Sequence, residues 1–414
     1  MQIPDVPPQL LAALVEAAAG QRLALVGGVV RDLLLHRHHQ DPWRGLPDLD
    51  LVVEGQAVEL VARLPAALEH QFGEPIPLRQ QPHGRYRTVE LELQLPQGLG
   101  GSWLVDLASA RREVYPEPAH NPVVSSGTLE QDLARRDVTV NAMALAFAPG
   151  GSFEVLLLDP HGGQADLARR QLRFLHSSSL ADDPTRMVRA ARYSARLGME
   201  LAPDALEQIH SVLTCWPWPW QIGDNPDDAP AALATRLRME LELLLEREPW
   251  SQALRQLQHW GVLGLLDQQL QSDPQWRRRL HWARRLQLPL LLCLVANAQD
   301  PLALARRLQL PQRQQAWLSQ MVCLQMKLVT EALPTGAETW CDWLEAPGLS
   351  AKAVALTIVA SPVALPQLSH WLFHWRHIQS PISASDLMGM GWQPGPSLGA
   401  ELKRQRFLNL EGCQ

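Results

Sequence analysis

The stretch that decides the fold of this chain is Leu23-Ala-Leu-Val-Gly-Gly-Val-Val-Arg-Asp-Leu-Leu-Leu35. Its first four residues predict a short buried strand, Gly27 and Gly28 a tight turn, and residues 30–35 the opening of a helix. Such a turn leaves unpaired backbone N–H groups at the start of the helix, where they can bind a phosphate. Arg31 adds a guanidinium group that can donate forked hydrogen bonds to phosphate oxygens. The stretch therefore predicts a phosphate-binding turn between a strand and a helix.

Two aspartates stand in the next apolar stretch, Pro47-Asp-Leu-Asp-Leu-Val-Val53. Its β-branched end predicts a strand. Because alternate residues of a strand point to the same face, the carboxylates of Asp48 and Asp50 should project side by side. Two close anions repel each other unless cations lie between them, and a pair of Mg²⁺ ions meets this need. Asp48 and Asp50 are therefore the candidate metal ligands and catalytic residues, and Mg²⁺ is the expected cofactor.

Each pattern has a plainer interpretation when it stands alone. Asp-x-Asp also occurs in solvated turns and in sugar-nucleotide transferases, and Gly-Gly before a helix is commonly only a turn. In combination, a phosphate-binding turn and metal-binding carboxylates indicate metal-assisted nucleotidyl transfer. The order and spacing of residues 26–35 and of Asp48-Leu-Asp-Leu-Val-Val-Glu-Gly55 resemble the signature of the class II tRNA nucleotidyltransferase and bacterial poly(A) polymerase family.

This resemblance implies an α+β fold. The expected architecture is an N-terminal polymerase-β-like nucleotidyltransferase head with a mixed β-sheet, followed by an all-α neck, body and tail. We place the catalytic head at residues 1–158. The helical neck, with a base-reading helix and a linker, is placed at 159–230, and the tRNA-binding body and tail at 231–414.

A second signature is Thr128-Leu-Glu-Gln-Asp-Leu-Ala-Arg-Arg-Asp-Val-Thr-Val-Asn-Ala-Met-Ala144. Thr128 and Gln131 predict a capping box at the start of a helix. The Arg-Arg-Asp sequence could be a set of surface charges, but it resembles the family's Arg-Arg-Asp-Phe-Thr-Ile-Asn-Ala element. The resemblance implies that Arg136 contacts the nucleotide, that Asp137 lies near the ribose, and that Asn141 supports the turn.

A third signature is Leu180-Ala-Asp-Asp-Pro-Thr-Arg-Met-Val-Arg-Ala-Ala-Arg-Tyr-Ser-Ala-Arg-Leu-Gly198, in which Pro184 and Gly198 predict the start and end of a helix. The three-residue spacing of Asp183, Arg186 and Arg189 places them on one helical face, which could equally be a salt-bridged solvent face. Cytosine and adenine each present an amino donor beside a ring-nitrogen acceptor. An aspartate and an arginine can therefore select them against uracil and guanine. The candidate pair is Asp183 and Arg186, with Arg189 and Arg192 holding the nucleotide.

Two further features of the head bear on the reaction. Trp103-Leu-Val-Asp-Leu107 predicts a strand whose Asp106 is either a third catalytic carboxylate or a surface residue. Arg111-Arg-Glu-Val-Tyr115 begins what we expect to be a long loop to Gly127. The family has a flexible segment here that reshapes the site between nucleotide additions. Its full length in this chain favours an enzyme that is not limited to adding cytidines.

The composition indicates a folded, soluble protein. The chain has 414 residues, of which 46% are hydrophobic, enough for two to four domains or subdomains. Its start shows no signal-peptide pattern, and its longest strongly apolar stretch, 288–296, is too short to span a bilayer. We therefore expect a cytoplasmic protein, with no membrane association and no protein partner.

Charge distribution and cysteine usage bear on RNA binding and on metal sites. The net charge is −6, yet residues 231–330 hold 13 Lys and Arg against 7 Asp and Glu, which is compatible with binding an RNA backbone and equally with solvated helix faces. The 5 cysteines lack metal-site spacing and are expected to be free thiols. The cluster of His36, His38 and His39 is expected in a loop.

Two stretches beyond the third signature carry further expectations. The segment Trp216-Pro-Trp-Pro-Trp220 could stack on bases but fits better as a stiff packed plug. Thr235-Arg-Leu-Arg-Met-Glu-Leu241 resembles a family helix in which Arg236 and Glu240 would form an i,i+4 pair.

The combined prediction is a template-independent nucleotidyltransferase that adds C, A or both from CTP and ATP to the 3′ end of tRNA. The alternatives are a poly(A) polymerase, a relative that adds only CC or only A, and a non-catalytic RNA-binding module. A sugar-nucleotide transferase is disfavoured because it would explain neither residues 128–144 nor residues 181–198.

Overall fold

The structure is a computed structural model that describes residues 3–46, 48–84, 87–96, 98–99, 101–148, 155–361 and 366–412. Pro47 and Cys413 lie outside these ranges. The chain divides into two compact units. Unit 1 comprises residues 1–221 and 230–262, and unit 2 comprises residues 222–229 and 263–414.

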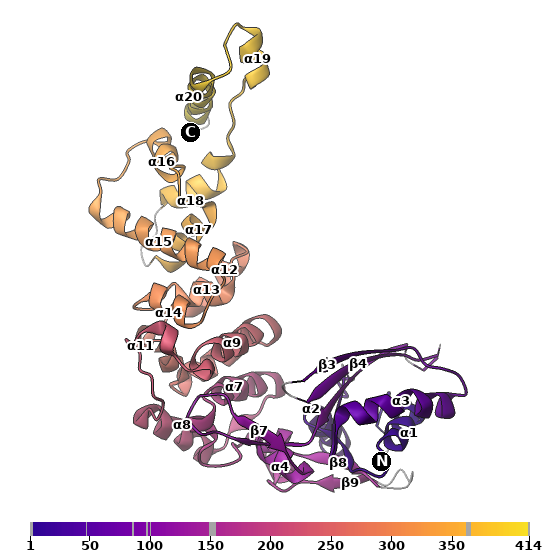
Figure 1. The fold of residues 1–414 in the computed structure, drawn as a ribbon. Coiled ribbons are helices and arrows are strands. Elements are labelled where there is room, and N and C mark those ends of the chain that lie inside the picture. Colours follow the sequence, from indigo (N-terminus) through magenta and orange to yellow (C-terminus); the bar gives the residue numbers. More distant parts are fainter. Residues whose placement is uncertain are drawn as a thin grey trace. The chain divides into compact units, whose positions relative to one another are not determined.

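Unit 1 contains a mixed seven-stranded sheet, which confirms the predicted α+β class (Figure 1). Its strands in chain order are β1 (Leu23–Val26), β2 (Leu49–Val53), β3 (Leu78–His83), β4 (Thr88–Gln94), β5 (Ser102–Ser109), β8 (Ala144–Phe147) and β9 (Val155–Leu158). The spatial order is β3-β4-β5-β2-β1-β8-β9. Strands β2 and β5 run parallel, and every other neighbouring pair is antiparallel.

Helices cover both faces of this sheet. On one face, α1 (Pro8–Ala17) and α3 (Ala57–Phe72) pack together, and α3 also contacts β4 and β5 (Figure 1). On the other face, α4 (Leu129–Ala134) buries Leu129 and Leu133 against Val52 of β2. Residue 52 lies on the same face of β2 as residues 48 and 50. Helix α4 therefore covers the Val52 end of this face, and its packing does not extend to Asp48 and Asp50.

Two local predictions need correction, and one strand was missed. The helix after the glycine turn, α2, runs from Gly28 to His39, so the histidine cluster lies in its last turn and not in a loop. The predicted loop after Ala110 contains a hairpin of β6 (Arg111–Val114) and β7 (Val123–Ser126). Strand β3 was not predicted, because its sequence Leu-Arg-Gln-Gln-Pro-His lacks apolar alternation and is largely exposed.

The segment predicted as the neck, residues 159–230, contains helices and one short pair of strands, and its residues belong to unit 1 except 222–229, which belong to unit 2. Its helices are α5 (Gly163–Arg169), α6 (Ser179–Asp182), α7 (Thr185–Leu197) and α8 (Pro203–Cys215), and its strands are the parallel pair β10 (Gln171–Leu172) and β11 (Glu200–Leu201). Helices α9 (Thr235–Arg247) and α10 (Trp250–His259) follow in the segment predicted as the body. Trp218 and Trp220 are buried, and the Trp218 indole donates a hydrogen bond to Ala181 O at 3.0 Å. The tryptophan segment therefore acts as a packed plug beside α6.

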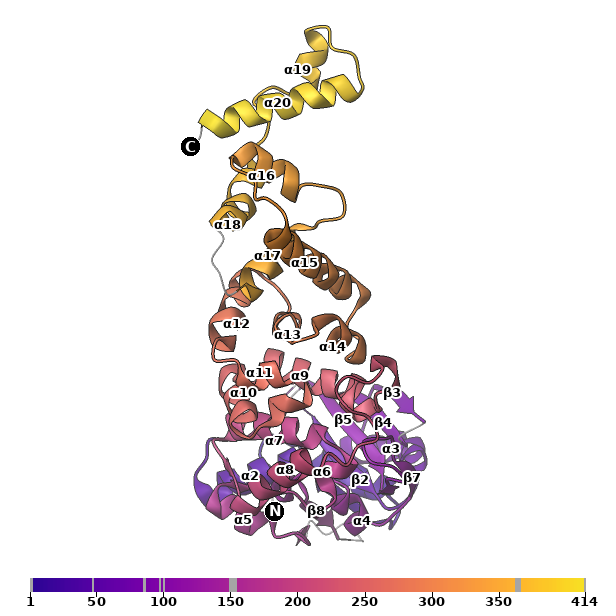
Figure 2. The same cartoon turned by 90° about the vertical axis from the view of Figure 1, so that its left-hand side faces the viewer.

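Unit 2 is helical in its described residues (Figure 2). Its helices are α11 (Gln268–Ser272), α12 (Trp276–Arg285), α13 (Leu290–Val295), α14 (Pro301–Arg307), α15 (Gln312–Thr330), α16 (Ala337–Leu344), α17 (Ala351–Ala360), α18 (Pro366–Phe373), α19 (Ala384–Gly389) and α20 (Pro396–Gly412). Helix α17 packs against α12, α13, α15 and α18. Among the described helices, none is long and apolar enough to cross a membrane. The division into head, neck and body stays a prediction, and the structure places α9 and α10 in the same unit as the head.

The capping box of α4 gives a test of this architecture. Thr128 Oγ1 accepts the Gln131 N–H at 3.3 Å, and Gln131 Oε1 accepts the Thr128 N–H at 3.1 Å. Replacing Thr128 by Ala should cost about 1 kcal/mol, because an N-cap oxygen is lost. We expect amide hydrogen exchange in residues 129–134 to become about fivefold faster, while Thr128→Ser, which keeps the oxygen, exchanges like the wild type. Equal exchange in all three proteins would contradict the capping role.

Candidate active site

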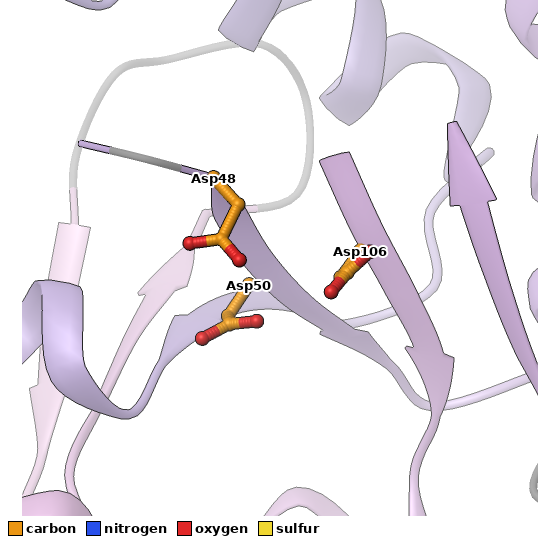
Figure 3. Close-up of side chains that lie close together, drawn as sticks. All are labelled: Asp48, Asp50 and Asp106. Atoms are coloured by element: carbon orange, nitrogen blue, oxygen red, sulfur yellow. The ribbon is translucent and has the colours of Figure 1, made fainter. Parts of the chain in front are cut away.

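Three half-buried carboxylates meet on one face of the central sheet (Figure 3). Asp48 immediately precedes β2, Asp50 lies on β2, and Asp106 lies on β5. The parallel register pairs Asp50 with Asp106, so the two side chains project from adjacent strands. One carboxylate oxygen from each of the three residues lies within 4.8 Å of the others. The predicted pair, Asp48 and Asp50, is therefore joined by Asp106, whose place in the site the sequence did not decide.

The electrostatics of the cluster fit a divalent cation. Burial and the neighbouring Asp48 charge raise the pKa of Asp50 to about 6, although Arg136 acts in the opposite direction. Burial and the Asp48 charge also raise the pKa of Asp106. Besides burial, the Asp48 charge therefore acts against ionisation of both Asp50 and Asp106. A hard divalent ion with oxygen ligands relieves this repulsion, so the donor set suits such a metal.

A cavity of about 550 Å³ opens beside the cluster. Its lining comes from the residue before β2 and from β3, β4 and β5. The lining residues are Asp48, Arg79, Gln80, Gln81, Glu90, Leu91, Glu92, Leu104 and Asp106. The unpredicted strand β3 therefore contributes one wall of the space next to the carboxylates.

The glycine turn lies directly against the cluster. Gly27 has φ +75° and is the residue before α2, whose start has no side-chain cap. A Cβ atom on Gly27 would lie 3.0 Å from Arg136 Nη1 and 3.7 Å from Asp50 Oδ2. Both the positive φ and this close approach require glycine. The turn, the Arg136 guanidinium and the Asp50 carboxylate are thus brought together, although they come from three different parts of the sequence.

Gly28 and Arg31 lie just inside α2. Arg31 is buried and donates to both carboxylate oxygens of Asp32 at 2.8 and 3.0 Å and to Asn141 Oδ1 at 2.7 Å. A Cβ atom on Gly28 would lie 3.4 Å from Arg31 Nη2. The Arg31 side chain therefore ties α2 to the turn at Asn141, and its contact with phosphate stays a prediction.

A chain of ion pairs connects Arg136 to the β6–β7 hairpin. Asp132, which is 1% exposed, accepts from Arg136 at 3.2 Å and from Arg135 at 2.9 Å. Arg135 also pairs with Glu113 of β6 at 3.4 Å, and Glu113 accepts from the Tyr115 hydroxyl at 3.1 Å. Sequence reasoning missed Asp132 and Glu113 as partners. Asp132 lies three residues before Arg135 and four before Arg136, and this helical spacing could have predicted the two ion pairs.

Asp137 is fully occupied by protein donors. Its carboxylate pairs with Arg189 at 2.9 Å and accepts from Tyr193, Asn141 and the Val138 N–H at 2.8, 3.2 and 2.8 Å. Although burial acts to raise it, Arg189 and these hydrogen bonds lower the pKa of Asp137 to about 2. Asp137 is thus a charged anchor between the head and α7, and its proximity to the ribose stays a prediction.

The expected base-reading pair lies at the start of α7. Asp183 Oδ1 accepts from the Thr185 N–H and hydroxyl at 3.1 and 2.6 Å, while its Oδ2 pairs with Arg236 of α9. Arg186 is buried, donates from Nη2 to Arg135 O at 2.9 Å, and has no hydrogen-bond partner at Nη1 among the described residues. A buried guanidinium N–H without a partner is costly and suits a donor reserved for a ligand.

The arginines of α7 and α9 pair differently from the sequence-based expectation. The predicted i,i+4 pair between Arg236 and Glu240 is wrong, because Arg236 pairs with Asp183 and Glu240 pairs with Arg192. Arg192 also lies 3.3 Å from the buried carboxylate of Glu248. These partners are distant in sequence and override the local spacing rule. Nucleotide contacts of Arg189 and Arg192 stay predictions, and both side chains form ion pairs here.

Comparisons with known proteins identify the head. Residues 23–173 match the model of the poly A polymerase head domain. A CC-adding tRNA nucleotidyltransferase of Deinococcus radiodurans is 42% identical over 253 residues, covering 60% of this chain and 57% of that protein. An A-adding tRNA nucleotidyltransferase of Aquifex aeolicus is 37% identical over 183 residues, covering 44% of this chain and 19% of that protein. The chain thus spans less than two thirds of either relative.

The fold is shared with solved enzymes. The Thermotoga maritima CCA-adding enzyme complexed with tRNA has a TM-score of 0.67 at 21% identity, covering 100% of this chain and 96% of that chain. Residues 23–173 therefore resemble the poly A polymerase head domain, as the motifs in this stretch predicted, and the solved structures show the same fold.

The raised pKa of Asp50 predicts how metal binding depends on pH. A ligating carboxylate must be ionised, so a proton competes with the metal below pH 6, where Asp50 is protonated in the metal-free protein. We expect the affinity for Mg²⁺ or Mn²⁺, measured by titration calorimetry, to be nearly constant above pH 7 and to fall about tenfold per pH unit below 6. Residual binding to Asp50→Asn should lose this dependence. An affinity independent of pH between 5 and 7 would exclude Asp50 as a ligand.

Proposed function

We propose that this protein adds C, A or both to the 3′ end of tRNA, using CTP and ATP and releasing pyrophosphate. The observation that carries the proposal is the convergence of the Gly27 turn, the Arg136 guanidinium and the Asp50 carboxylate at one point. This arrangement combines a phosphate-binding turn, a cation for the triphosphate and a metal ligand. The named activities of the relatives from D. radiodurans and A. aeolicus agree with it.

The proposed mechanism uses the chain's own residues for binding and positioning. Asp48 and Asp50, with Asp106 beside them, would hold two Mg²⁺ ions, which when bound activate the terminal 3′-hydroxyl and stabilise the departing pyrophosphate. The backbone of Gly27 and Gly28 would receive the triphosphate, where the start of α2 favours an anion. Arg136, next to both, would neutralise charge on the triphosphate and sugar.

The choice of base would be made at the start of α7. Arg186 Nη1 offers a donor for the ring nitrogen of cytosine or adenine, and Asp183 offers an acceptor for the exocyclic amino group. In this structure Arg236 and Thr185 occupy the Asp183 carboxylate. One of these partners must therefore yield, or share the carboxylate, when a base binds.

The main alternatives differ in the number and kind of nucleotides that the enzyme would add. Relatives named for CC addition and for A addition both match this chain, so a partial specificity stays open even though the segment after Tyr115 has full length. A poly(A) polymerase would use the same chemistry. The direct test is to incubate the protein with tRNA lacking its last three nucleotides and with CTP, ATP or both, and to sequence the products. No incorporation in the presence of Mg²⁺ would leave the non-catalytic RNA-binding alternative.

Removing one metal ligand gives the first mutational test. Asp50→Asn should reduce incorporation by about 1,000-fold, because the loss of metal-assisted charge stabilisation costs several kcal/mol in the transition state. Binding of tRNA, measured by fluorescence anisotropy, should stay within about twofold. The matched control is Glu92→Gln, which removes a carboxylate from the same cavity outside the cluster. Equal losses in the two variants would refute the assignment of Asp50.

Removing the base-reading acceptor gives the second test. Asp183→Ala should weaken the preference for CTP and ATP over UTP and GTP by at least about tenfold, because a buried hydrogen bond to the base edge is lost. Asp182→Asn is the matched control, since Asp182 is the neighbouring carboxylate and bonds to Ser178. We would abandon the base-reading role if Asp183→Ala kept the full preference among the four nucleotides.

A further inference from the structure

A second cavity, of about 490 Å³, lies within unit 2 and is lined by four cations from four elements. They are Arg285 at the end of α12, Arg313 in the first turn of α15, Lys352 in the first turn of α17, and Arg376 in the 3₁₀ turn Trp375–His377. The lining contains no carboxylate in the part of the chain that the structure describes. Four like charges around one space repel each other unless an anion joins them.

Each arginine is held in place without being neutralised. The guanidinium carbons of Arg285, Arg313 and Arg376 lie 5.3, 5.0 and 5.6 Å from the ring centroids of three tryptophans. These tryptophans are Trp282, Trp317 and Trp371. A cation over an indole face keeps its charge and its N–H donors. Within the described residues none of the three arginines forms an ion pair, so their donors stay available to a ligand.

Lys352 has a separate structural role that supports the cavity. Its ammonium group donates to the carbonyl oxygens of Leu286 and Gln287 at 3.3 and 3.1 Å, at the end of α12. Arg313 and Lys352, by contrast, stand in the first turns of their helices, where the helix dipole disfavours a cation. An anion in the cavity would compensate for both, because the two helix starts also favour negative charge.

We propose that this cavity binds phosphates of an RNA backbone, an inference that rests on the proposed function for the class of substrate. Arg285, Arg313 and Arg376 are exposed, and the exposed aromatic side chains of Trp282 and Phe373 flank them. Arginines beside exposed aromatic rings suit a nucleic acid better than a small free anion, because rings can pack on sugars or bases next to the phosphate. The local excess of positive charge in residues 231–330 includes Arg285 and Arg313.

The salt dependence of RNA binding tests this site without requiring catalysis. We compare the full-length wild type with the double variant Arg313→Gln/Arg376→Gln and with Arg284→Gln, which removes an exposed arginine of α12 outside the cavity lining. Binding of a labelled tRNA transcript is measured by anisotropy over a range of NaCl concentrations. Each RNA phosphate that a variant no longer neutralises reduces the slope of log K against log salt by about 1.

We expect the double variant to bind RNA more weakly, with a slope reduced by about 2, and Arg284→Gln to keep the wild-type slope. In the nucleotide-addition assay the KM for tRNA should rise while the KM for CTP stays unchanged. Equal slopes in the wild type and the double variant overturn the proposal. Unchanged RNA binding, combined with loss of inorganic phosphate binding in calorimetry, also overturns it and leaves a small-anion site. RNA binding that depends on the cavity in a protein that adds no nucleotide would refute the proposed function but not this site.

Discussion

The repulsion among Asp48, Asp50 and Asp106 is the constraint around which the head is organised. The register of β2 and β5 places Asp50 beside Asp106, and the strand periodicity places Asp48 on the same face. A sheet cannot separate these charges without losing its register, since a slip of one residue would turn the aspartates toward the opposite, buried face. Burial and the neighbouring Asp48 charge both raise the pKa of Asp50, so its ionised form is disfavoured at this position. A fold that maintains such a cost at an open cavity is arranged to bind a cation.

The same structure links the carboxylate cluster to Asp183 and Arg186, the residues proposed to read the base. Arg136 lies at the glycine turn and shares Asp132 with Arg135, while the Arg135 carbonyl oxygen accepts from Arg186. The β6–β7 hairpin joins this chain through Glu113. Residue-to-residue contacts therefore run from the carboxylate cluster to the start of α7. A base bound at Arg186 and a triphosphate bound at Arg136 would be held by one continuous set of ion pairs and hydrogen bonds, which fixes their separation.

Much of this could be predicted from sequence, because the deciding signals are local. The glycine turn, strand β2, the capping box at Thr128, and the limits of α7 at Pro184 and Gly198 all follow from residues within a few positions of one another. Strand β3 escaped prediction because it is polar and largely exposed, so that pairing with β4 defines it and apolar alternation does not.

The partners of the arginines could not be predicted for a similar reason. Glu240 lies four residues after Arg236, but Arg236 forms its ion pair with Asp183, which lies 53 residues earlier. Surface i,i+4 pairs contribute only a few tenths of a kcal/mol, so a buried carboxylate elsewhere in the fold outcompetes them. For the carboxylate cluster, the motif supplied Asp48 and Asp50, and the sequence left open whether Asp106 joins them. The pairing of β2 with β5 places Asp106 beside Asp50.

The most direct measurement is anomalous diffraction from crystals of the protein soaked with Mn²⁺ and CTP. We predict manganese peaks within coordination distance of carboxylate oxygens of Asp48 and Asp50, with the triphosphate at the backbone of Gly27 and Gly28. Manganese bound elsewhere, with these two aspartates free of metal and the triphosphate away from the glycine turn, would contradict the central claim.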